Sequence, residues 1–458
     1  MLTTKLRFLT LLLPLLTLSS VYAASGNRLL DRGRTEPVVL SDPRHPSTVI
    51  VGANPNFGAP VNNTYPMPFF TSHDGGRSFQ RGVVPLPSAY ISATDPSLGI
   101  APSGTIFYGF SAVHPGSSTC ANCKCTESER PHGAILLSRS VDGGRSFRPP
   151  TVVDTSDNAD RPNLTVEGVS GHAAHVFMTW TRTQTDVWYA RSTNGGVRFS
   201  HPVQLYKSNY GDAPSLPIVP APGQVAVFWI ETGGDNADGT TSARILLQTS
   251  TDDGLHFGPV QTVAGWFKTM PRQVQPGNLR TPPSFTVVAG PGGTLFVAWP
   301  EIRQVRTGGL LDADIELTWS KDGGVSWHSP RAVNNVRTGD RFMPAMSAFP
   351  DGSIGLSFYD RRAGPNNLGV FAVHVTIRGG FRRSANVPVS LHYANIAFIH
   401  QIPSSNACGS VSPGRFFGDY MGTSASRSKT LRVTWADSGL GVHEETDVWL
   451  ARVQLPAL

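Results

Sequence analysis

The stretch Ser-Lys-Asp-Gly-Gly-Val-Ser-Trp, which runs from Ser320 to Trp327, recurs in near-copies along the chain. The other copies run from Ser72 to Phe79, from Ser140 to Phe147, from Ser192 to Phe199 and from Ser250 to Phe257. The shared pattern is Ser-x-Asp-x-Gly-x-x-aromatic, with Asn194 in place of the aspartate in the third copy. Recurrence of one short pattern along the whole chain indicates a repeated structural unit.

Each copy has the chemistry of a tight connection between two strands. A short carboxylate or amide can accept hydrogen bonds from nearby backbone N–H groups, and glycine takes backbone angles that are closed to residues with a Cβ atom. The aromatic residue then begins the next strand and can pack beside the turn. We therefore interpret the aspartates of the motif, Asp74, Asp142, Asp252 and Asp322, as structural rather than catalytic.

The motif and its placement resemble the Asp-box, or bacterial neuraminidase repeat, of the sialidase-like β-propellers. In that family the box closes the turn between the third and fourth strands of a blade, on the face opposite the active site. The resemblance covers nearly the whole chain after its first residues. The segments Tyr359 to Phe371 and Phe416 to Gly422 look like those of exported bacterial members. The resemblance is specific for the fold and much less so for a reaction.

The first residues of the chain have the pattern of a secretory signal peptide. Lys5 and Arg7 precede a short apolar run, and small residues lead to Ala23. We expect a signal peptide over 1–23, one propeller domain over 24–458, and a secreted monomer. No later stretch is long and apolar enough to cross a bilayer. The formal charge of +6 is too mild and dispersed to favour nucleic acid as a partner.

The four cysteines are Cys120, Cys123 and Cys125 in one predicted loop and Cys408 far downstream. In an exported chain they predict two disulfides, with three possible connectivities, and Cys408 would join one member of the cluster. A zinc site with four thiolate ligands is the alternative.

A second pattern comes before each motif: a segment with proline, a turn, and a β-run that ends in a large or apolar residue. The equivalent last positions are Ala53, Phe110, Trp180, Trp229, Trp299, Phe358 and Trp435. This period, with four strand-like runs in each unit, predicts an all-β protein that is a single β-propeller of seven four-stranded blades. Six blades with an additional strand pair, as in known sialidases, is the alternative. The run near Glu36 to Leu40 could complete the last blade and close the ring.

Two sets of polar residues are expected on the face opposite the motif turns. The first set stands just before the predicted innermost strands and contains Asp95, Asp160, Arg161, Asp212, Arg280, Asp340, Arg341, Arg415, Asp419 and Tyr420. The second set follows the end of each second strand and contains Arg182, Glu231, Glu301, Asp360 and Asp437. Paired carboxylates can serve as proton donor and base or nucleophile in glycoside hydrolysis, and arginines can hold an acidic sugar.

From these sets we select candidate site residues. The candidate catalytic residues are Tyr420, Glu301, Asp95, Glu231, Asp360 and Asp437, and the candidate substrate-binding residues are Arg161, Arg280, Arg341 and Arg415. Resemblance to the sialidases implies three arginines for the substrate carboxylate, here Arg280, Arg341 and Arg415. It also implies a tyrosine nucleophile, here Tyr420, with a carboxylate such as Asp419 or Glu301 as its base. The Arg-Ile-Pro motif of the family is absent from the chain.

The sequence therefore predicts a sialidase-like propeller that acts on extracellular glycans or glycoconjugates as a glycoside hydrolase of terminal sugars, acidic ones included. A non-catalytic propeller that binds a glycan or a protein through the same face is the alternative. A polysaccharide lyase on this scaffold is a third reading, because Tyr420 could serve as its base. No cofactor and no metal site is expected, and His172 and His175 are interpreted as packing residues.

Overall fold

Strands make up nearly all of the regular structure in the computed structural model of the chain. The model describes residues 24–56, 61, 64–114, 133–156, 158–169, 171–183, 185–211, 214–306, 311–399, 401–402, 414–426, 429–439 and 446–458. The predicted signal peptide (1–23), Asp212 and the four cysteines Cys120, Cys123, Cys125 and Cys408 lie outside these residues. Their roles stay predictions. In the described part of the chain, no helix is long and apolar enough to span a membrane.

Seven antiparallel sheets of the described chain share one design, in which four strands pair in sequence order or nearly so. The first contains β2 (Val38–Ser41), β3 (Val49–Gly52), β4 (Pro68–Ser72) and β5 (Gln80–Val83). The second contains β6 (Ser92–Ile100), β7 (Ile106–Val113), β8 (Gly133–Ser140) and β9 (Thr151–Asp154). The third contains β10 (Asp160–Glu167), β11 (His175–Thr181), β12 (Asp186–Ser192) and β13 (Val203–Lys207). The fourth contains β14 (Ser215–Ile218), β15 (Val225–Asp235), β16 (Thr241–Ser250) and β17 (Gln261–Thr269).

The remaining sheets follow the same design with additions. The fifth contains β20 (Thr286–Ala289), β21 (Leu295–Val305), β22 (Leu311–Ser320) and β23 (Arg331–Ala332). The sixth contains β24 (Arg341–Ala348), β25 (Ile354–Asp360), β26 (Asn367–Thr376) and β27 (Arg382–Arg383), and β28 (Val387–Pro388) and β29 (Ala394–Asn395) also pair with β26. The seventh contains β32 (Gly422–Ala425), β33 (Thr430–Asp437), β34 (Asp447–Gln454) and β1 (Ala24–Arg32). A small eighth sheet joins β18 (Gln273–Val274), β19 (Leu279–Arg280), β31 (Gly414–Arg415) and β30 (Gln401–Ile402), and two short 3-10 helices are Pro291–Gly293 and Ile396–Phe398.

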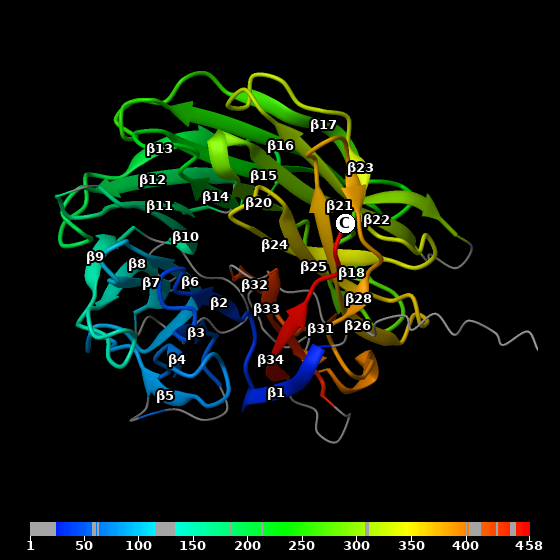
Figure 1. Cartoon of the computed structure of the whole chain (residues 1–458), viewed down its shortest axis with the longest axis horizontal. Coiled ribbons are helices and arrows are strands. Elements are labelled where there is room, and N and C mark those ends of the chain that lie inside the picture. The colour runs from blue at the N-terminus through cyan, green and yellow to red at the C-terminus, as the bar shows by residue number, and fades with distance from the viewer. Residues whose placement is uncertain are drawn as a thin grey trace, which may run out of the picture.

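The first strands of the seven sheets stand around a common centre (Figure 1). In chain order each contacts the next, from β2 through β6, β10, β14, β20 and β24 to β32, and β32 contacts β2. The Ser41 N–H also donates to the Ser424 hydroxyl at 2.9 Å, which ties the first sheet to the seventh. The prediction of an all-β propeller built from four-stranded sheets is confirmed.

The seventh sheet is completed differently from the expectation. Its outer strand is β1, which pairs antiparallel with β34, whereas the run near Glu36 to Leu40 leads into β2. That run therefore begins the first sheet and does not complete the last one. The outer edge of the last sheet is provided by the residues directly after the predicted leader.

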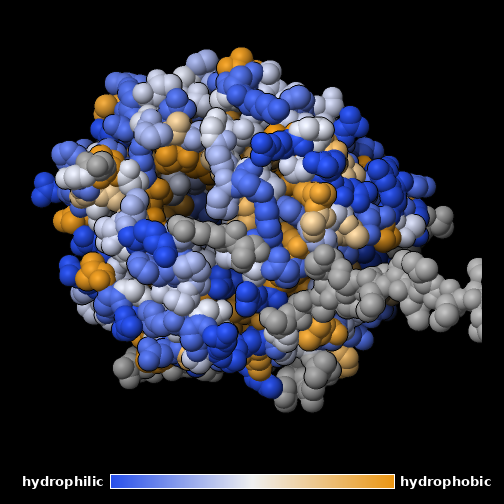
Figure 2. Space-filling view, viewed as in Figure 1, coloured by the Kyte–Doolittle hydropathy of each residue, from blue (hydrophilic) through white to orange (hydrophobic). Residues whose placement is uncertain are grey.

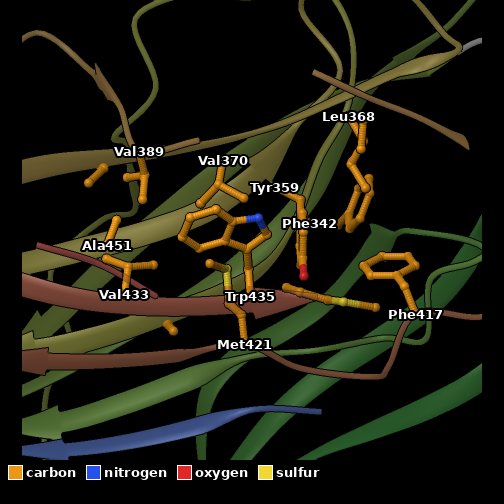
Figure 3. Close-up of a cluster of buried hydrophobic side chains, with 14 of the residues drawn as sticks. Phe342, Tyr359, Leu368, Val370, Val389, Phe417, Met421, Val433, Trp435 and Ala451 are labelled. Carbon is orange, nitrogen blue, oxygen red and sulfur yellow. The ribbon is translucent and has the colours of Figure 1, made fainter. Parts of the chain in front are cut away.

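The hydrophobic core consists of layers between neighbouring sheets. The seven positions aligned from the sequence, Ala53 to Trp435, all lie on or directly after a second strand and are buried. Figure 3 shows one such layer, where Trp435 of β33 and Met421 face Tyr359 of β25 and Phe342 of β24. Side chains of both sheets thus share one apolar layer, which fixes each sheet against the next.

The repeated motif forms the turns between third and fourth strands, from β4–β5 to β22–β23. In the copy at Ser320, the buried hydroxyl accepts from the Gly324 N–H at 2.8 Å and donates to Asp322 at 2.7 Å. Asp322 in turn accepts from the Ser326 N–H at 2.9 Å. The aspartate therefore closes its own turn, as expected. Because strands alternate in direction, these turns lie at the opposite end of each sheet from the start of its innermost strand.

Candidate active site

Four of the innermost strands are preceded or opened by a residue–proline pair with unusual backbone angles. The residues before proline are Glu36 (φ 56°), Asp95 (φ 57°), Arg161 (φ 53°) and Met343 (φ 50°). Positive φ is uncommon for residues other than glycine, and such strained positions cluster at functional sites. The shared geometry shows that one local design is repeated around the channel.

Each of these pairs sits in a β-bulge. In β6, β10 and β24 the strand pairing shifts register across the pair. The same shift occurs before β2. The Asn54 N–H donates to the Thr35 carbonyl at 2.9 Å, and Val38 pairs with Gly52, so Glu36 and Pro37 on one strand lie opposite the single residue Ala53 on the other. A bulge redirects the side chain of its extra residue. The bulges therefore determine where Glu36, Asp95 and Arg161 place their charged groups.

A cavity of about 310 Å³ lies between the innermost strands. Residues from all seven of these strands or the segments directly before them line it, and most of the wall is apolar or hydroxyl-bearing. Its charged lining residues are Asp95, Arg161 and Asp419, and Tyr420 lies beside them. Figure 2 shows one face of the molecule, largely hydrophilic, with a hollow near the middle of the ring.

Asp419 is the centre of the charged cluster. Arg280 binds it through two contacts, Nε to Oδ1 at 2.8 Å and Nη2 to Oδ2 at 2.6 Å, and Arg161 Nη2 lies 3.2 Å from Oδ2. The small sheet brings these residues together, because β19, which ends at Arg280, pairs in parallel with β31, shortly before Asp419. Two-point contact between a guanidinium and a carboxylate fixes both groups.

Glu36 connects this cluster to the second sheet. Its Oε1 accepts from the Asp419 N–H at 3.1 Å, and its Oε2 accepts from Asn54 Nδ2 at 2.6 Å. The Asn54 Oδ1 accepts from the Asp95 N–H at 2.9 Å. Gly418 makes this approach possible, since a Cβ atom there would lie 2.8 Å from the Glu36 nitrogen.

The electrostatics of the cluster favour protonated carboxyl groups. Burial, followed by the charge of Asp419, raises the pKa of Glu36 to about 7. Burial and the neighbouring carboxylates Glu36 and Asp160 raise the pKa of Asp95 well above its usual range. Burial, then Glu36 and Asp95, also raise the pKa of Tyr420 well above its ordinary value. The site therefore holds carboxyl groups whose protonated forms are favoured, Glu36 with a pKa near neutral pH among them, which is the property of a general acid.

The Tyr420 hydroxyl is buried and has no hydrogen-bond partner among the described residues. A buried polar group without a partner is costly, so such a group commonly marks a position for water or ligand. The hydroxyl belongs to a residue that lines the cavity. A ligand in this cavity could therefore supply the missing partner.

The structure brings four of the predicted site residues to this cluster, namely Asp95, Arg161, Arg280 and Tyr420. It does not bring the others there. None of Glu231, Glu301, Asp360, Asp437, Arg341 and Arg415 lines the cavity in the described part of the chain.

The predicted residues at the ends of second strands are bound within or beside their own sheets. Glu231 is fully buried and contacts Arg244 Nε at 2.5 Å and the Tyr206 hydroxyl at 2.8 Å. Trp299 Nε1 donates to Glu301 at 3.1 Å, and Trp435 Nε1 donates to Asp437 at 2.8 Å. These carboxylates act as hydrogen-bond acceptors for neighbouring side chains, among them the buried Trp299 and Trp435.

Two of the predicted arginines are also engaged elsewhere. Arg341 has no exposed surface; its Nε donates to Asp360 at 3.0 Å and its other nitrogens donate to backbone carbonyls. Asp360 is equally buried and also accepts from Arg362. Arg415 Nη1 donates to the Ile399 carbonyl at 2.7 Å. A guanidinium without exposed surface cannot reach a substrate, so the expected roles of Arg341 and Asp360 are replaced by a buried ion pair.

Glu36 is the site residue that the sequence reasoning missed. The signal was present, because Glu36-Pro37 has the same form as Asp95-Pro96 and Arg161-Pro162. The repeated pattern is more degenerate in the first unit, so its residue before proline is not among the candidates that the sequence predicts. Asp419 was expected beside Tyr420 as a base, whereas its carboxylate is held by two arginines.

No protein-family model matches the chain, and no curated protein matches it. Among solved structures, the chain is similar to the NanB sialidase of Streptococcus pneumoniae, with 11% identity, 74% of this chain and 67% of that chain covered, and a TM-score of 0.47. It is similar to the intramolecular trans-sialidase of Ruminococcus gnavus, with 11% identity, 92% and 94% covered, and a TM-score of 0.43. It is also similar to an alpha-L-arabinanase of Penicillium chrysogenum, with 12% identity, 80% and 95% covered, and a TM-score of 0.44.

Proposed function

We propose that the cluster around Tyr420 is the active site of a secreted glycoside hydrolase that acts on extracellular glycans. The observation that carries this proposal is the buried Tyr420 hydroxyl, which has no partner among the described residues and belongs to a residue that lines the cavity. Two carboxyl groups with raised pKa values, Glu36 and Asp95, act on it electrostatically.

Asp95 is assigned as the general acid. Burial and its carboxylate neighbours raise its pKa well above the usual range, which favours the protonated form that a general acid needs, and it lines the cavity where a leaving group would lie. Protonation of the glycosidic oxygen lets the bond to the anomeric carbon break without release of an alkoxide. The bulge before Ser97 holds this carboxyl in place.

Tyr420 is assigned as the nucleophile and Glu36 as its base. Because the pKa of Tyr420 is raised, free phenolate is scarce and its proton must leave during attack. The proton passes to the Glu36 carboxylate while the phenolic oxygen bonds to the anomeric carbon and Asp95 protonates the leaving oxygen. Water then cleaves the glycosyl–tyrosine bond with Asp95 as base, and Tyr420 recovers its proton from Glu36.

The direct test is turnover of fluorogenic aryl glycosides by the purified mature protein, with an α-sialoside first and neutral glycosides beside it. We expect Tyr420→Phe and Asp95→Asn to lower kcat by at least about 100-fold with the fold retained. Tyr393→Phe, at a partly exposed position, and Glu301→Gln, at a predicted carboxylate outside the cavity, are the matched controls. Equal losses in the controls, or a folded wild-type protein without turnover on any glycoside, would contradict the assignment.

A non-catalytic propeller that binds a glycan through the same cavity is the second candidate. The observation that favours it is the contact of both Arg161 and Arg280 with Asp419, which neutralises much of their charge before a ligand arrives. This candidate expects saturable sugar binding that Tyr420→Phe weakens, with no bond cleavage. Product analysis by mass spectrometry after long incubation distinguishes the two.

A further inference from the structure

A second polar cluster lies at the other end of the sheets, where the third sheet meets the fourth. Glu167 is the last residue of β10 and His175 is the first residue of β11, and the two are paired across the strand ladder. Asp253 comes from the repeated turn between β16 and β17. One ligand atom of each of the three residues lies within 4.8 Å of the other two.

The atoms of this cluster face one another without forming hydrogen bonds. His175 Nδ1 lies 3.9 Å from Glu167 Oε2 and 3.7 Å from Asp253 Oδ1, beyond hydrogen-bond distance. Both His175 Nδ1 and Glu167 Oε2 are buried and have no hydrogen-bond partner among the described residues. The Glu167 side chain is only 8% exposed, so water does not readily satisfy its second oxygen.

The neighbouring backbone holds the three residues in place. Glu167 Oε1 accepts from the Gly223 N–H at 2.7 Å, which leaves Oε2 directed at the histidine. The Asp253 N–H donates to the Gly223 carbonyl at 3.0 Å, and Arg191 donates to the Asp253 carbonyl at 3.0 Å. These contacts involve the backbone of Asp253 and leave its carboxylate available to the cluster.

The sequence of the turn supports a special role for Asp253. In the other four copies of the motif this position is glycine with positive φ: Gly75, Gly143, Gly195 and Gly323. Asp253 has φ 58°, so it adopts the left-handed conformation that glycine adopts more easily. The one copy with a carboxylate at this position is the copy that faces His175 and Glu167.

We propose that Glu167, His175 and Asp253 bind a Zn²⁺ ion. One imidazole nitrogen and two carboxylate oxygens suit zinc, whereas magnesium and calcium prefer oxygen ligands alone. Tetrahedral zinc bonds of about 2.0–2.2 Å place neighbouring ligand atoms roughly 3.4 Å apart. The two separations from His175 Nδ1, 3.9 and 3.7 Å, therefore need to shorten by only a few tenths of an ångström, and the two carboxylates lie within 4.8 Å of each other. Asp253 is partly exposed and gives the ion a path from solvent, and water would fill the fourth position.

The proposed ion would link two sheets. Glu167 and His175 belong to the third sheet and Asp253 to the fourth, so metal binding would add a contact between neighbouring sheets on the face of the repeated turns. This role is structural and does not depend on the proposed glycosidase chemistry.

The test is zinc content and cobalt absorption of the full chain after treatment with a chelator and readdition of one metal at a time. We expect the wild-type chain to bind one equivalent of Zn²⁺ more than Asp253→Gly and His175→Gln. Asp253→Gly is the sharper variant, because it restores the residue of the other copies and preserves the turn. His172→Gln, at an exposed histidine three residues away, is the control that keeps the wild-type metal content.

Two further readouts make the result decisive. Co²⁺ should give a visible d–d absorption in the wild-type chain that Asp253→Gly lacks, and added Zn²⁺ should raise the thermal midpoint of the wild-type chain but not of Asp253→Gly. Zinc bound by the cysteines would be common to all variants and would cancel in the difference. Equal zinc content in the wild type and Asp253→Gly would overturn the proposal.

Discussion

Glu36 links groups that are distant in sequence, because its two carboxylate oxygens accept hydrogen bonds from Asp419 and Asn54. Glu36 is only 4% exposed, and this burial is the main reason that the pKa of its carboxyl group is raised to about 7. The same carboxyl can therefore serve the proposed chemistry and influence the stability of the fold.

The raised pKa of Glu36 predicts a pH-dependent stability. Between about pH 4.5 and pH 7 the folded chain keeps a proton that the unfolded chain releases, so the free energy of unfolding falls as pH rises through this window and is level above it. The contribution is at most about 3.5 kcal/mol, at about 1.4 kcal/mol for each pKa unit. Glu36→Gln, which cannot ionise, should flatten the profile measured by urea unfolding. Because Glu316 also has a pKa raised to about 7, the quantity to compare is the difference between wild type and variant; parallel profiles would contradict the assignment.

At the scale of a single element, the segment before β32 depends on one glycine. Gly418 has φ 119°, and a Cβ atom there would lie 2.8 Å from the Glu36 nitrogen and 2.9 Å from its Cγ. This close approach lets the next residue, Asp419, reach Glu36 through its N–H and lets its side chain reach Arg280. The glycine therefore sets the position of both Asp419 and Tyr420.

Gly418→Ala should separate the segment from Glu36 and disturb the candidate site. We expect a loss of roughly 2–4 kcal/mol in the free energy of unfolding, from backbone strain together with the clash, and a large loss of any glycosidase activity or sugar binding. Gly379→Ala is the matched control, because Gly379 has φ 72° but nothing lies within 4 Å of its added Cβ atom. Chemical unfolding and ligand binding of the two variants provide the measurement, and similar effects in both would show that only backbone strain matters.

At the scale of the whole molecule, the repeat predicted the architecture because its signals are local. Each turn needs only its own serine, aspartate and glycine, and the buried tryptophans, from Trp180 to Trp435, mark the second strands by position alone. The closing strand β1 carries no copy of the motif. Its pairing with β34 joins the two ends of the chain, which a periodic pattern does not report.

The candidate site could be predicted only in part for a related reason. Arg161 stands directly before proline and is turned to the cavity by a bulge, whereas Arg341 stands three residues before Pro344 and is buried against Asp360. Both precede or begin an innermost strand, so their general location did not distinguish them. The number of residues between each arginine and the following proline does distinguish them, and the same criterion, a charged residue directly before proline, also identifies Glu36.

The closure by β1 gives the last prediction. β1 forms the outer edge of the seventh sheet, and Asn27 also connects it to the sixth, donating to the Val389 carbonyl at 2.8 Å and accepting from the Leu391 N–H at 2.6 Å. Deletion of residues 24–32 would leave β34 unpaired along one edge and expose its backbone groups, a common route to aggregation. We expect the chain that lacks residues 24–32 to unfold at a thermal midpoint several degrees below that of the intact chain and to aggregate on heating, as followed by circular dichroism and light scattering.

Deletion of Ala457 and Leu458, which follow β34 at the other end, is the control and should leave the midpoint nearly unchanged. If both deletions melted like the intact chain, β1 would contribute little to ring closure, and the direct contact between β2 and β32 would have to hold the ring closed.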